Sequence, residues 1–129
     1  MTAAASKKPK IHVAVIESDP LRFIGFRSLF ENEPELELVA ASLNEVTASP
    51  TVDVVLLGSR NERNLFDIMA GMKAARPGLR IIVTGSGMDD ETILKALAAG
   101  AKGYVDEAAS AAEFTTAIGI VHQGSVWAP

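Results

Sequence analysis

Polar and acidic residues follow the apolar runs that the sequence predicts to be strands. They are Glu17, Ser18 and Asp19 after Ile11–Ile16, Ser59 after Asp53–Leu57, Thr84 and Ser86 around the end of Arg80–Thr84, and Glu107 after Gly103–Val105. In open parallel sheets, chemistry takes place just beyond the carboxyl ends of the strands. Carboxylates and hydroxyls gathered there could bind a divalent cation or hold a phosphoryl group.

Gly58 is the most informative of these positions, because it directly follows the most apolar run of the chain and has no side chain. A carboxylate at this place could accept a phosphoryl group, whereas a glycine can accept nothing. Asp53 is expected to be a surface acid at the opposite end of the same strand, far from the site, and not a substitute acceptor. Ser59 is a hydroxyl that a kinase of another class could modify, and Gly58 could also be an ordinary loop glycine.

Strands and helices are predicted to alternate along the chain. The predicted strands are Ile11–Ile16, Leu36–Ala41, Asp53–Leu57, Arg80–Thr84 and Gly103–Val105. The predicted helices run from Asp19-Pro20 to about Glu31, through at most one turn at Asn44–Ala48, over Leu65–Arg76 and Glu91–Ala99, and from Ser110 to about Gln123. This alternation predicts an α/β fold: a three-layer, doubly wound, five-stranded parallel sheet of order 2-1-3-4-5, flavodoxin-like, with a shortened second helix.

Length and composition limit the function classes. The chain has 129 residues, the size of one domain, and its 48% apolar residues with only 5% aromatics predict an aliphatic core. The net charge of −4 argues against direct nucleic-acid binding by this segment. The absence of cysteine excludes disulfides, thiol catalysis and cysteine–zinc sites. No apolar run approaches the roughly 20 residues of a membrane span, so no membrane contact and a cytoplasmic location are expected.

The sequence predicts a disordered tail over residues 1–10, with the solubilising cluster Lys7-Lys8-Lys10, and one domain over residues 11–124. The family resemblance described below implies that residues 125–129 begin a linker. Gly85-Ser86-Gly87 suggests a phosphate cradle, but the next helix starts only after Asp89-Asp90, which favours a flexible loop. His12 and His122 have no nucleophile nearby in sequence and are expected to be structural.

Several segments resemble a known family. They are Val13–Leu21, Glu33–Val39, Asp53–Leu57 and, most closely, Leu97–Val105, in the right order and spacing. In these segments the chain resembles the receiver domains of bacterial response regulators, within them the NarL- and LuxR-type subgroup that has a helix-turn-helix output domain. The resemblance implies the receiver fold.

The family resemblance also implies a phosphorylation site, from which this chain departs. Receivers use two adjacent acids for magnesium and an aspartate as phosphate acceptor; here Glu17 keeps the first acid, Ser18 replaces the second, and Gly58 replaces the acceptor. We therefore expect a degenerate pocket, no phosphotransfer, and weak or absent magnesium binding, with no cofactor.

Three further positions follow from the same resemblance. Thr84 could supply the hydroxyl that contacts the phosphoryl group, although counting back from Gly103-Tyr104 places Gly85 there. Glu107 stands where typical receivers have a lysine after the fifth strand, and it reverses the charge at that position. Tyr104 matches the aromatic that many receivers rotate on activation.

Apolar residues on two helices suggest an interface. Phe23 and Ile24 lie on the first helix, and Gly119 and Ile120 lie on or near the outer side of the last helix, which neighbours the first in the receiver fold. The four residues would suit a homodimer. The alternative is a wide face buried within the monomer.

Two functions remain open. The first is a non-enzymatic, phosphorylation-independent receiver domain that acts through a homodimer or a regulatory protein partner, either alone or beside a helix-turn-helix DNA-binding output that follows Gly124–Pro129 and regulates transcription. The second is a small-ligand or nucleotide binder, or an enzyme, that uses Glu17, Asp19, Thr84 and Ser86.

Overall fold

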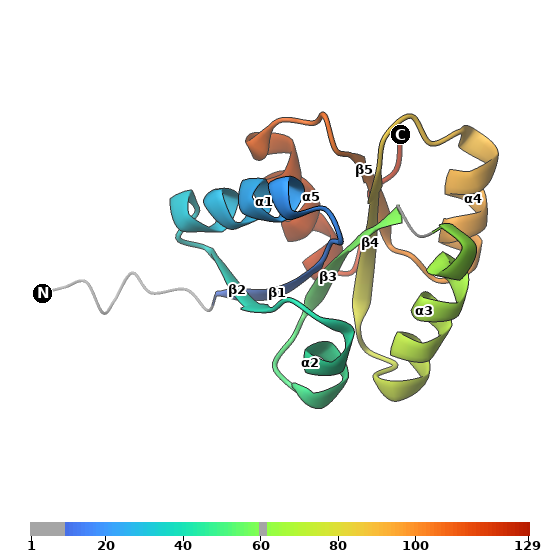
Figure 1. The fold of residues 1–129 in the computed structure, drawn as a ribbon, viewed down its shortest axis with the longest axis horizontal. Helices are drawn as coiled ribbons and strands as arrows, with labels where there is room; N and C mark the ends of the chain where they lie inside the picture. The colour runs from blue at the N-terminus through green and yellow to red at the C-terminus, as the bar shows by residue number, and fades with distance from the viewer. Residues whose placement is uncertain (1–9, 60–61) are drawn as a thin grey trace, which may run out of the picture.

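The computed structural model describes residues 10–59 and 62–129, in which strands and helices alternate (Figure 1). The strands are β1 (Ile11–Ile16), β2 (Leu36–Ala40), β3 (Val54–Gly58), β4 (Arg80–Gly85) and β5 (Gly103–Asp106). The helices are α1 (Pro20–Asn32), α2 (Leu43–Ala48), α3 (Glu62–Ala75), α4 (Asp90–Ala98) and α5 (Ala111–His122). The predicted tail lies, except for Lys10, outside the described residues.

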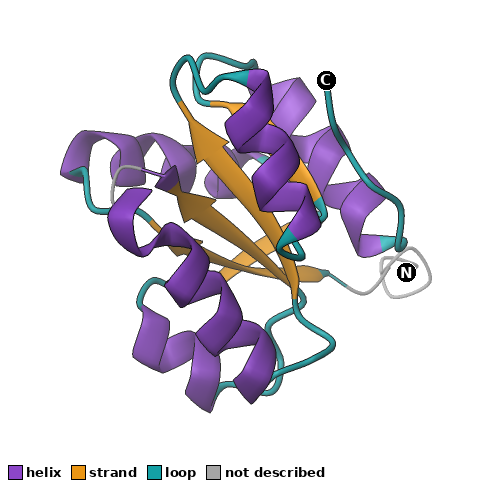
Figure 2. Ribbon diagram, turned by 90° about the vertical axis from the view of Figure 1, so that its right-hand side faces the viewer, coloured by secondary structure: helices purple, strands orange, loops and turns teal. Residues whose placement is uncertain are grey.

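The five strands form one parallel sheet in the order β2-β1-β3-β4-β5. Helices cover both of its faces (Figure 2). The predicted doubly wound, flavodoxin-like fold is confirmed. All the strands end at the same edge, which we call the carboxyl edge, so the residues that follow them meet there.

Two apolar clusters lie on the two faces of the sheet, because successive strand residues point to opposite sides. Val13 and Val15 of β1 pack with the cluster that includes residues of α1 and α5, whereas Ala14 packs with the cluster of α3 and α4. Strand β3 is buried throughout Val54–Leu57, as a central strand covered on both faces should be. This packing on both faces positions the carboxyl edge.

Side chains cap α1, α4 and α5 where the sequence predicts these helices to start. The Asp19 carboxylate accepts a hydrogen bond from the Leu21 amide and Pro20 opens α1, while Asp89 caps α4 and Ser110 caps α5. Each cap satisfies an amide that the helix itself leaves unpaired. Asp89, the first of the two acids that precede the predicted helix start, is the residue that caps α4.

The second helix is longer than one turn. It spans six residues, because the Ser42 hydroxyl accepts from the Glu45 amide and the Glu45 carboxylate accepts from the Ala41 amide. This pair resembles a capping box, with the Glu45 carboxylate bonded to the amide one residue before the cap, and it stabilises the start of the helix. Helix α3 also begins at Glu62, three residues before the predicted Leu65, and β4 extends through Gly85, one residue beyond Thr84.

The C-terminal segment packs against the edge of the sheet. The Trp127 amide donates to the Lys102 carbonyl, and the Trp127 carbonyl accepts from the Tyr104 amide, both at 2.9 Å. A Cβ on Gly103 would lie 3.0 Å from the Trp127 carbonyl oxygen, so the close approach depends on this glycine. Part of the predicted linker therefore pairs with β5.

Among the described residues, none of the helices combines the length and the apolar character that crossing a membrane requires.

Candidate functional site

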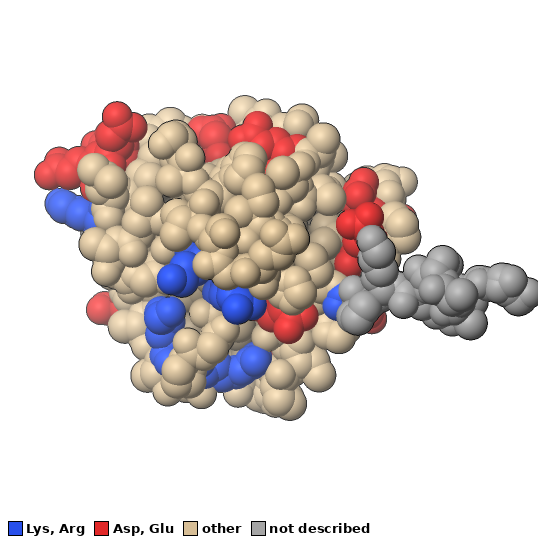
Figure 3. Space-filling view, turned by 180° about the vertical axis from the view of Figure 1, so that it is seen from behind, with Lys and Arg blue, Asp and Glu red and all other residues tan. Residues whose placement is uncertain are grey.

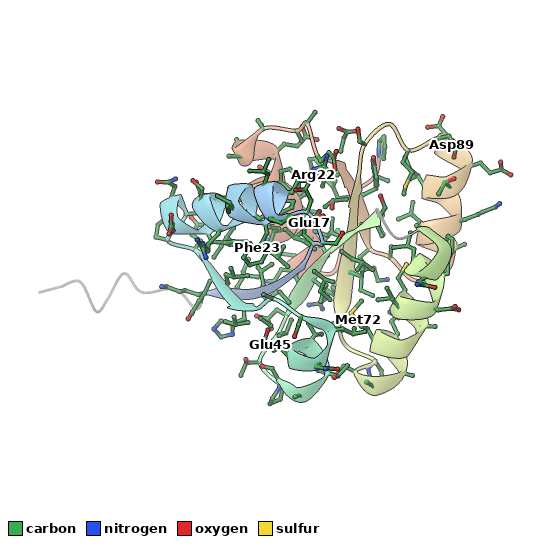
Figure 4. All side chains as sticks on the ribbon, in the orientation of Figure 1. Glu17, Arg22, Phe23, Glu45, Met72 and Asp89 are labelled. Atoms are coloured by element: carbon green, nitrogen blue, oxygen red, sulfur yellow. The ribbon has the colours of Figure 1, made fainter. Side chains whose placement is uncertain are left out.

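The strand register brings the predicted site residues together at the carboxyl edge. Ile16 pairs with Leu57, Gly58 with Thr84, and Gly85 with Asp106. The residues that come next in each strand or loop, Glu17, Ser59 and Glu107 among them, are consequently neighbours, and Figure 4 shows Glu17 and Arg22 at this end of the molecule.

The Glu17 side chain occupies the space that an acceptor at position 58 would need. A Cβ on Gly58 would lie 2.8 Å from Glu17 Oε1 and 3.2 Å from Glu17 Cδ. The carboxylate is held in place by the Asp19 amide, which donates to Glu17 Oε2 at 3.0 Å. Gly58 thus faces a carboxylate of the same chain.

The Ser59 side chain likewise occupies the space that a side chain at position 85 would need. A Cβ on Gly85 would collide with Ser59 Oγ and would lie 3.6 Å from Tyr104 Cε1. Ser59 is 8% exposed. A kinase acting on Ser59 would therefore meet a largely buried hydroxyl.

Gly85, and not Thr84, faces this part of the site. Val83 packs with the α3 and α4 cluster and Ile82 with the α1 and α5 cluster, so Thr84 points to the side of Ile82 and Gly85 to the side of Val83. Tyr104 belongs to the same cluster as Val83. The position that the family fills with a hydroxyl thus has no side chain here, as counting back from Gly103-Tyr104 indicates.

Tyr104 is buried, and its hydroxyl is directed at the same edge. The hydroxyl donates to the Gly85 carbonyl at 3.2 Å and lies 3.4 Å from Asp106 Oδ2. Burial raises the pKa of the Tyr104 phenol, and the negative charge of Asp106 raises it further. The aromatic ring is held inward by contacts within the domain.

The Asp106 carboxylate accepts hydrogen bonds from backbone amides of two loops. It accepts from the Ala108 amide at 2.9 Å and from the Gly87 amide at 3.3 Å, and these bonds lower its pKa. Gly87 adopts φ +62°, which places its amide in this direction. An anion that approached the Gly85-Ser86-Gly87 loop would have to compete with this carboxylate.

Glu107 is paired with Arg22 of α1. The two side chains form an ion pair in which Arg22 is 26% and Glu107 13% exposed. The Glu107 amide also donates to the Gly85 carbonyl at 2.9 Å. Glu107, which stands at the position of the family's lysine, therefore links α1 to the turn after β5 through this ion pair.

The residues present do not fit a magnesium ion. Magnesium needs several hard oxygen ligands, normally more than one carboxylate together with phosphate oxygens. Here Ser18 and Gly58 offer no carboxylate, and Glu17 already accepts from a backbone amide. In the part of the chain that the structure describes, no three acidic or histidine side chains are placed to hold a metal ion.

A small cavity of about 140 Å³ remains beside Glu17 and Gly58. Its other walls are mostly apolar and include Leu57, Leu65 and Ile68, with no lysine or arginine. The surrounding edge holds four carboxylates, namely those of Glu17, Asp19, Asp106 and Glu107. A phosphoryl group would meet negative charge at this edge and no unengaged cation among its described lining residues.

The remaining predicted residues lie elsewhere. Asp53 lies at the opposite edge of the sheet, where its carboxylate accepts from the His12 amide at 3.0 Å. The His12 ring lies between Glu37 and Asp53, at 3.6 and 3.9 Å. His122 lies in the last turn of α5, far along the chain from any nucleophile of the edge. Neither histidine is part of the site.

Sequence reasoning missed two functional contacts. Arg22 was not singled out, because nothing local to α1 indicates that its partner lies after β5. Asp106 was passed over because it lies at the end of a short apolar strand, although an aspartate at the start of a turn commonly bonds the backbone amide two residues on.

Solved structures share this fold at low sequence identity. The chain matches a LuxR family DNA-binding response regulator from Silicibacter pomeroyi with a TM-score of 0.76 and 22% identity, over 92% of this chain and 97% of that chain. It matches the apo receiver domain of RcsB from Salmonella enterica serovar Typhimurium with a TM-score of 0.81 and 17% identity, over 93% of each.

A third match is the signal receiver domain of the putative response regulator NarL from Mycobacterium tuberculosis, with a TM-score of 0.78 and 19% identity over 91% of this chain and 99% of that chain. At these identities the likeness shows the receiver fold. No curated protein sequence matches the chain.

One family model matches in sequence. It describes the N-terminal part of the pilus assembly protein TadZ and covers residues 32–125, from the end of α1 to just beyond α5. Those residues include Gly58, Gly85, Tyr104 and Glu107, and they make up well over half of the chain. The chain is a receiver-fold member of the TadZ N-terminal family of pilus assembly proteins.

Proposed function

We propose that this domain is a non-enzymatic interaction module of a pilus-assembly protein, a receiver fold that works without phosphorylation and through protein–protein contact. The observation that supports this most directly is the occupation of the former phosphorylation site. Glu17 takes the space above Gly58, and Ser59 takes the space beside Gly85.

The charges at the carboxyl edge support the same proposal. A phosphoryl group is a dianion and is stabilised in proteins by cations and by backbone amides. At this edge Arg22 is paired with Glu107, and the Gly87 and Ala108 amides bind Asp106. Because this cation and these amides already bind carboxylates of the same chain, they are not available to bind a phosphoryl group.

The contact surface that we propose lies on α1 and α5. Leu21 is 79% and Ile24 53% exposed, although both are large apolar side chains. Phe23 and Ile120 are half-buried, and a Cβ on Gly119 would meet no atom within 4 Å. A glycine on an open helix surface allows another helix to approach closely, and exposed apolar groups of this kind mark interaction sites.

A pocket of about 260 Å³ between the same two helices adds to this surface. Its walls include Phe26, Leu29 and Phe114, with the Arg22–Glu107 pair at one side. In a two-fold symmetric dimer, an exposed side chain of α1 such as Leu21 or Ile24 could enter the pocket of the partner copy. We therefore propose a homodimer through α1 and α5.

Phosphorylation is tested by incubating the chain with magnesium and acetyl phosphate and measuring its intact mass. We expect no added phosphate and no rise in melting temperature, whereas a typical receiver domain treated in parallel gains one phosphate. Covalent phosphate on this chain would contradict the proposal.

The dimer is tested separately by light scattering. The wild-type chain should have the mass of a dimer, and Ile24→Glu or Ile120→Glu should give a monomer. Leu94→Glu is the matched control, because Leu94 is 64% exposed on α4, away from this surface. A monomeric wild-type chain at high concentration would contradict the dimer without affecting the prediction on phosphorylation.

The alternative function, a nucleotide or small-ligand binder, is addressed by the same melts with nucleotides added. A ligand that binds only the folded chain raises its melting temperature. The attached helix-turn-helix output, expected from the resemblance, stays a prediction, and the match to pilus assembly proteins favours a role in that assembly instead.

A further inference from the structure

Charged side chains are unevenly distributed over the molecule. Figure 3 shows Lys and Arg side chains gathered on the lower part of one face, with some acidic atoms beside them, and further Asp and Glu along its upper border. The described acids at or near the carboxyl edge are Glu17, Asp19, Asp89, Asp90, Glu91, Asp106, Glu107 and Glu113. A chain with a net charge of −4 thus still presents a positive region.

The positive region lies at the opposite, amino edge of the sheet, and we call Lys73, Arg80 and Lys102 the basic patch. Lys73 is in the last turn of α3, Arg80 opens β4, and Lys102 directly precedes β5. The Lys102 amide donates to the Ile81 carbonyl at 2.7 Å, which places Lys102 beside the start of β4.

Local packing fixes the position of Lys73. Its stem crosses the turn at Gly100, where a Cβ would lie 2.9 Å from Lys73 Cδ and 3.6 Å from its Nζ. Gly100 has φ +113° and lies two residues before Lys102. Lys73 is therefore held over the turn between α4 and β5 that leads to Lys102.

The cations of the basic patch have no acidic partner among the described residues. The ion pairs of the described chain join His12 to Glu37 and Asp53, Arg22 to Glu107, and Lys95 to Glu91. Arg76, at the rim of the patch, instead donates to the Ser49, Pro50 and Val52 carbonyls, so its charge remains unneutralised. Lys73 lies where a cation compensates the partial negative charge at the carboxyl end of α3, which explains its placement in part. Arg80 and Lys102 lie outside the helices, so this effect does not explain them.

The surface of opposite sign is the start of α4. Asp89, Asp90 and Glu91 are consecutive and exposed. Helix α4 begins at these acids and ends just before Gly100, so its two ends face the two edges of the sheet. The same domain thus carries complementary charges at opposite ends of one helix.

We propose that the basic patch binds the acidic start of α4 of a second copy, so that copies associate head to tail. Electrostatic complementarity of this kind selects partners and orients them, and it weakens with salt. Because the two surfaces differ, the contact is heterologous and can repeat along an open chain of copies. It is distinct from the symmetric α1 and α5 dimer and does not depend on it.

The test uses the Ile120→Glu chain, in which the proposed dimer is removed, and measures its average mass by light scattering at increasing salt. We expect association at about 20 mM NaCl that falls at least about tenfold in its constant by about 300 mM. Lys73→Glu/Lys102→Glu and Asp90→Lys/Glu91→Lys should each abolish it. Lys10→Glu/Arg27→Glu changes the net charge as much as the first double variant, lies on neither surface and should retain it.

Mixing the two reversed variants provides the decisive result. In Lys73→Glu/Lys102→Glu both the patch and the start of α4 carry acids, and in Asp90→Lys/Glu91→Lys both carry cations. The mixture should therefore associate again, although neither variant does alone. This recovery also shows that both variants are folded. A mixture that stays monomeric, or a wild-type patch that binds anionic vesicles while the copies do not associate, would overturn the proposal.

Discussion

The Glu17 carboxylate lies where a side chain at position 58 would begin, 2.8 Å from the Cβ that Gly58 lacks. The contact joins the ends of β1 and β3, which the register of Ile16 with Leu57 places side by side. The loss of the acceptor side chain and the position of Glu17 are therefore one structural feature, and it can be tested by restoring the acceptor.

Gly58→Asp should destabilise the fold without restoring phosphorylation. The end of the Glu17 side chain is flexible and can move, so the steric cost is small, but a second carboxylate then faces the first. We expect Gly58→Asp to lower the free energy of unfolding by about 1–3 kcal/mol more than the uncharged, equally large Gly58→Asn. Urea unfolding at pH 7 measures the difference, and adding Glu17→Gln should remove it. Equal stability of the two single variants would show that Glu17 does not face position 58.

Gly85→Thr, which introduces the hydroxyl residue of the family, should collide with Ser59. Overpacking of a buried site typically costs about 1–3 kcal/mol. Replacing Ser59 by glycine removes the colliding hydroxyl, so the double variant should be more stable than the sum of the two single changes predicts. A double-mutant cycle by urea unfolding gives this coupling energy. Strict additivity would mean that Ser59 does not fill the space beside Gly85.

Glu107→Lys, which introduces the family's lysine, should place two cations together at the turn after β5. Arg22 and Glu107 are both largely shielded from solvent, so we expect a loss of about 1–3 kcal/mol, more than for Glu107→Gln. The charge-swapped variant Arg22→Glu/Glu107→Lys should recover most of the loss. Arg27→Glu, an exposed change on the same helix, is the control and should stay within about 0.5 kcal/mol of wild type.

Tyr104 should make the stability fall in alkaline solution. Burial, and then the Asp106 charge, raise the pKa of the phenol above the ordinary 10.0. Above pH 10 the unfolded chain loses the phenolic proton while the folded chain retains it, so the folded state binds more protons and the free energy of unfolding decreases as the pH rises through the folded pKa.

The phenol can be followed directly, because the chain contains one tyrosine. The ultraviolet absorbance of the phenolate should appear at higher pH in the folded chain than in urea. Asp106→Asn should bring the two titrations closer without making them coincide, since burial is the larger cause. Tyr104→Phe should remove this part of the pH dependence, and identical titrations of the folded and unfolded chains would contradict the prediction.

The fold was predictable because its signals are local. The continuous apolar run of β3, the capping pair Asp19-Pro20 and the glycine Gly100 just after α4 each lie within a few residues of the element they define. The start of α3 and the length of α2 were predicted less accurately, because the local signals there were weak or were not recognised. The capping pair of Ser42 and Glu45 was not recognised, and the residues before Leu65 have no apolar period.

By itself, the sequence determined the doubly wound sheet, the missing side chain at Gly58 and the reversed charge at Glu107, since each depends on residue type and order alone. Only the tertiary structure decided what occupies the vacated space. The pairs Glu17 with Gly58, Ser59 with Gly85, and Arg22 with Glu107 join segments far apart in the chain. They form because strand register and helix packing set distances that no local pattern encodes.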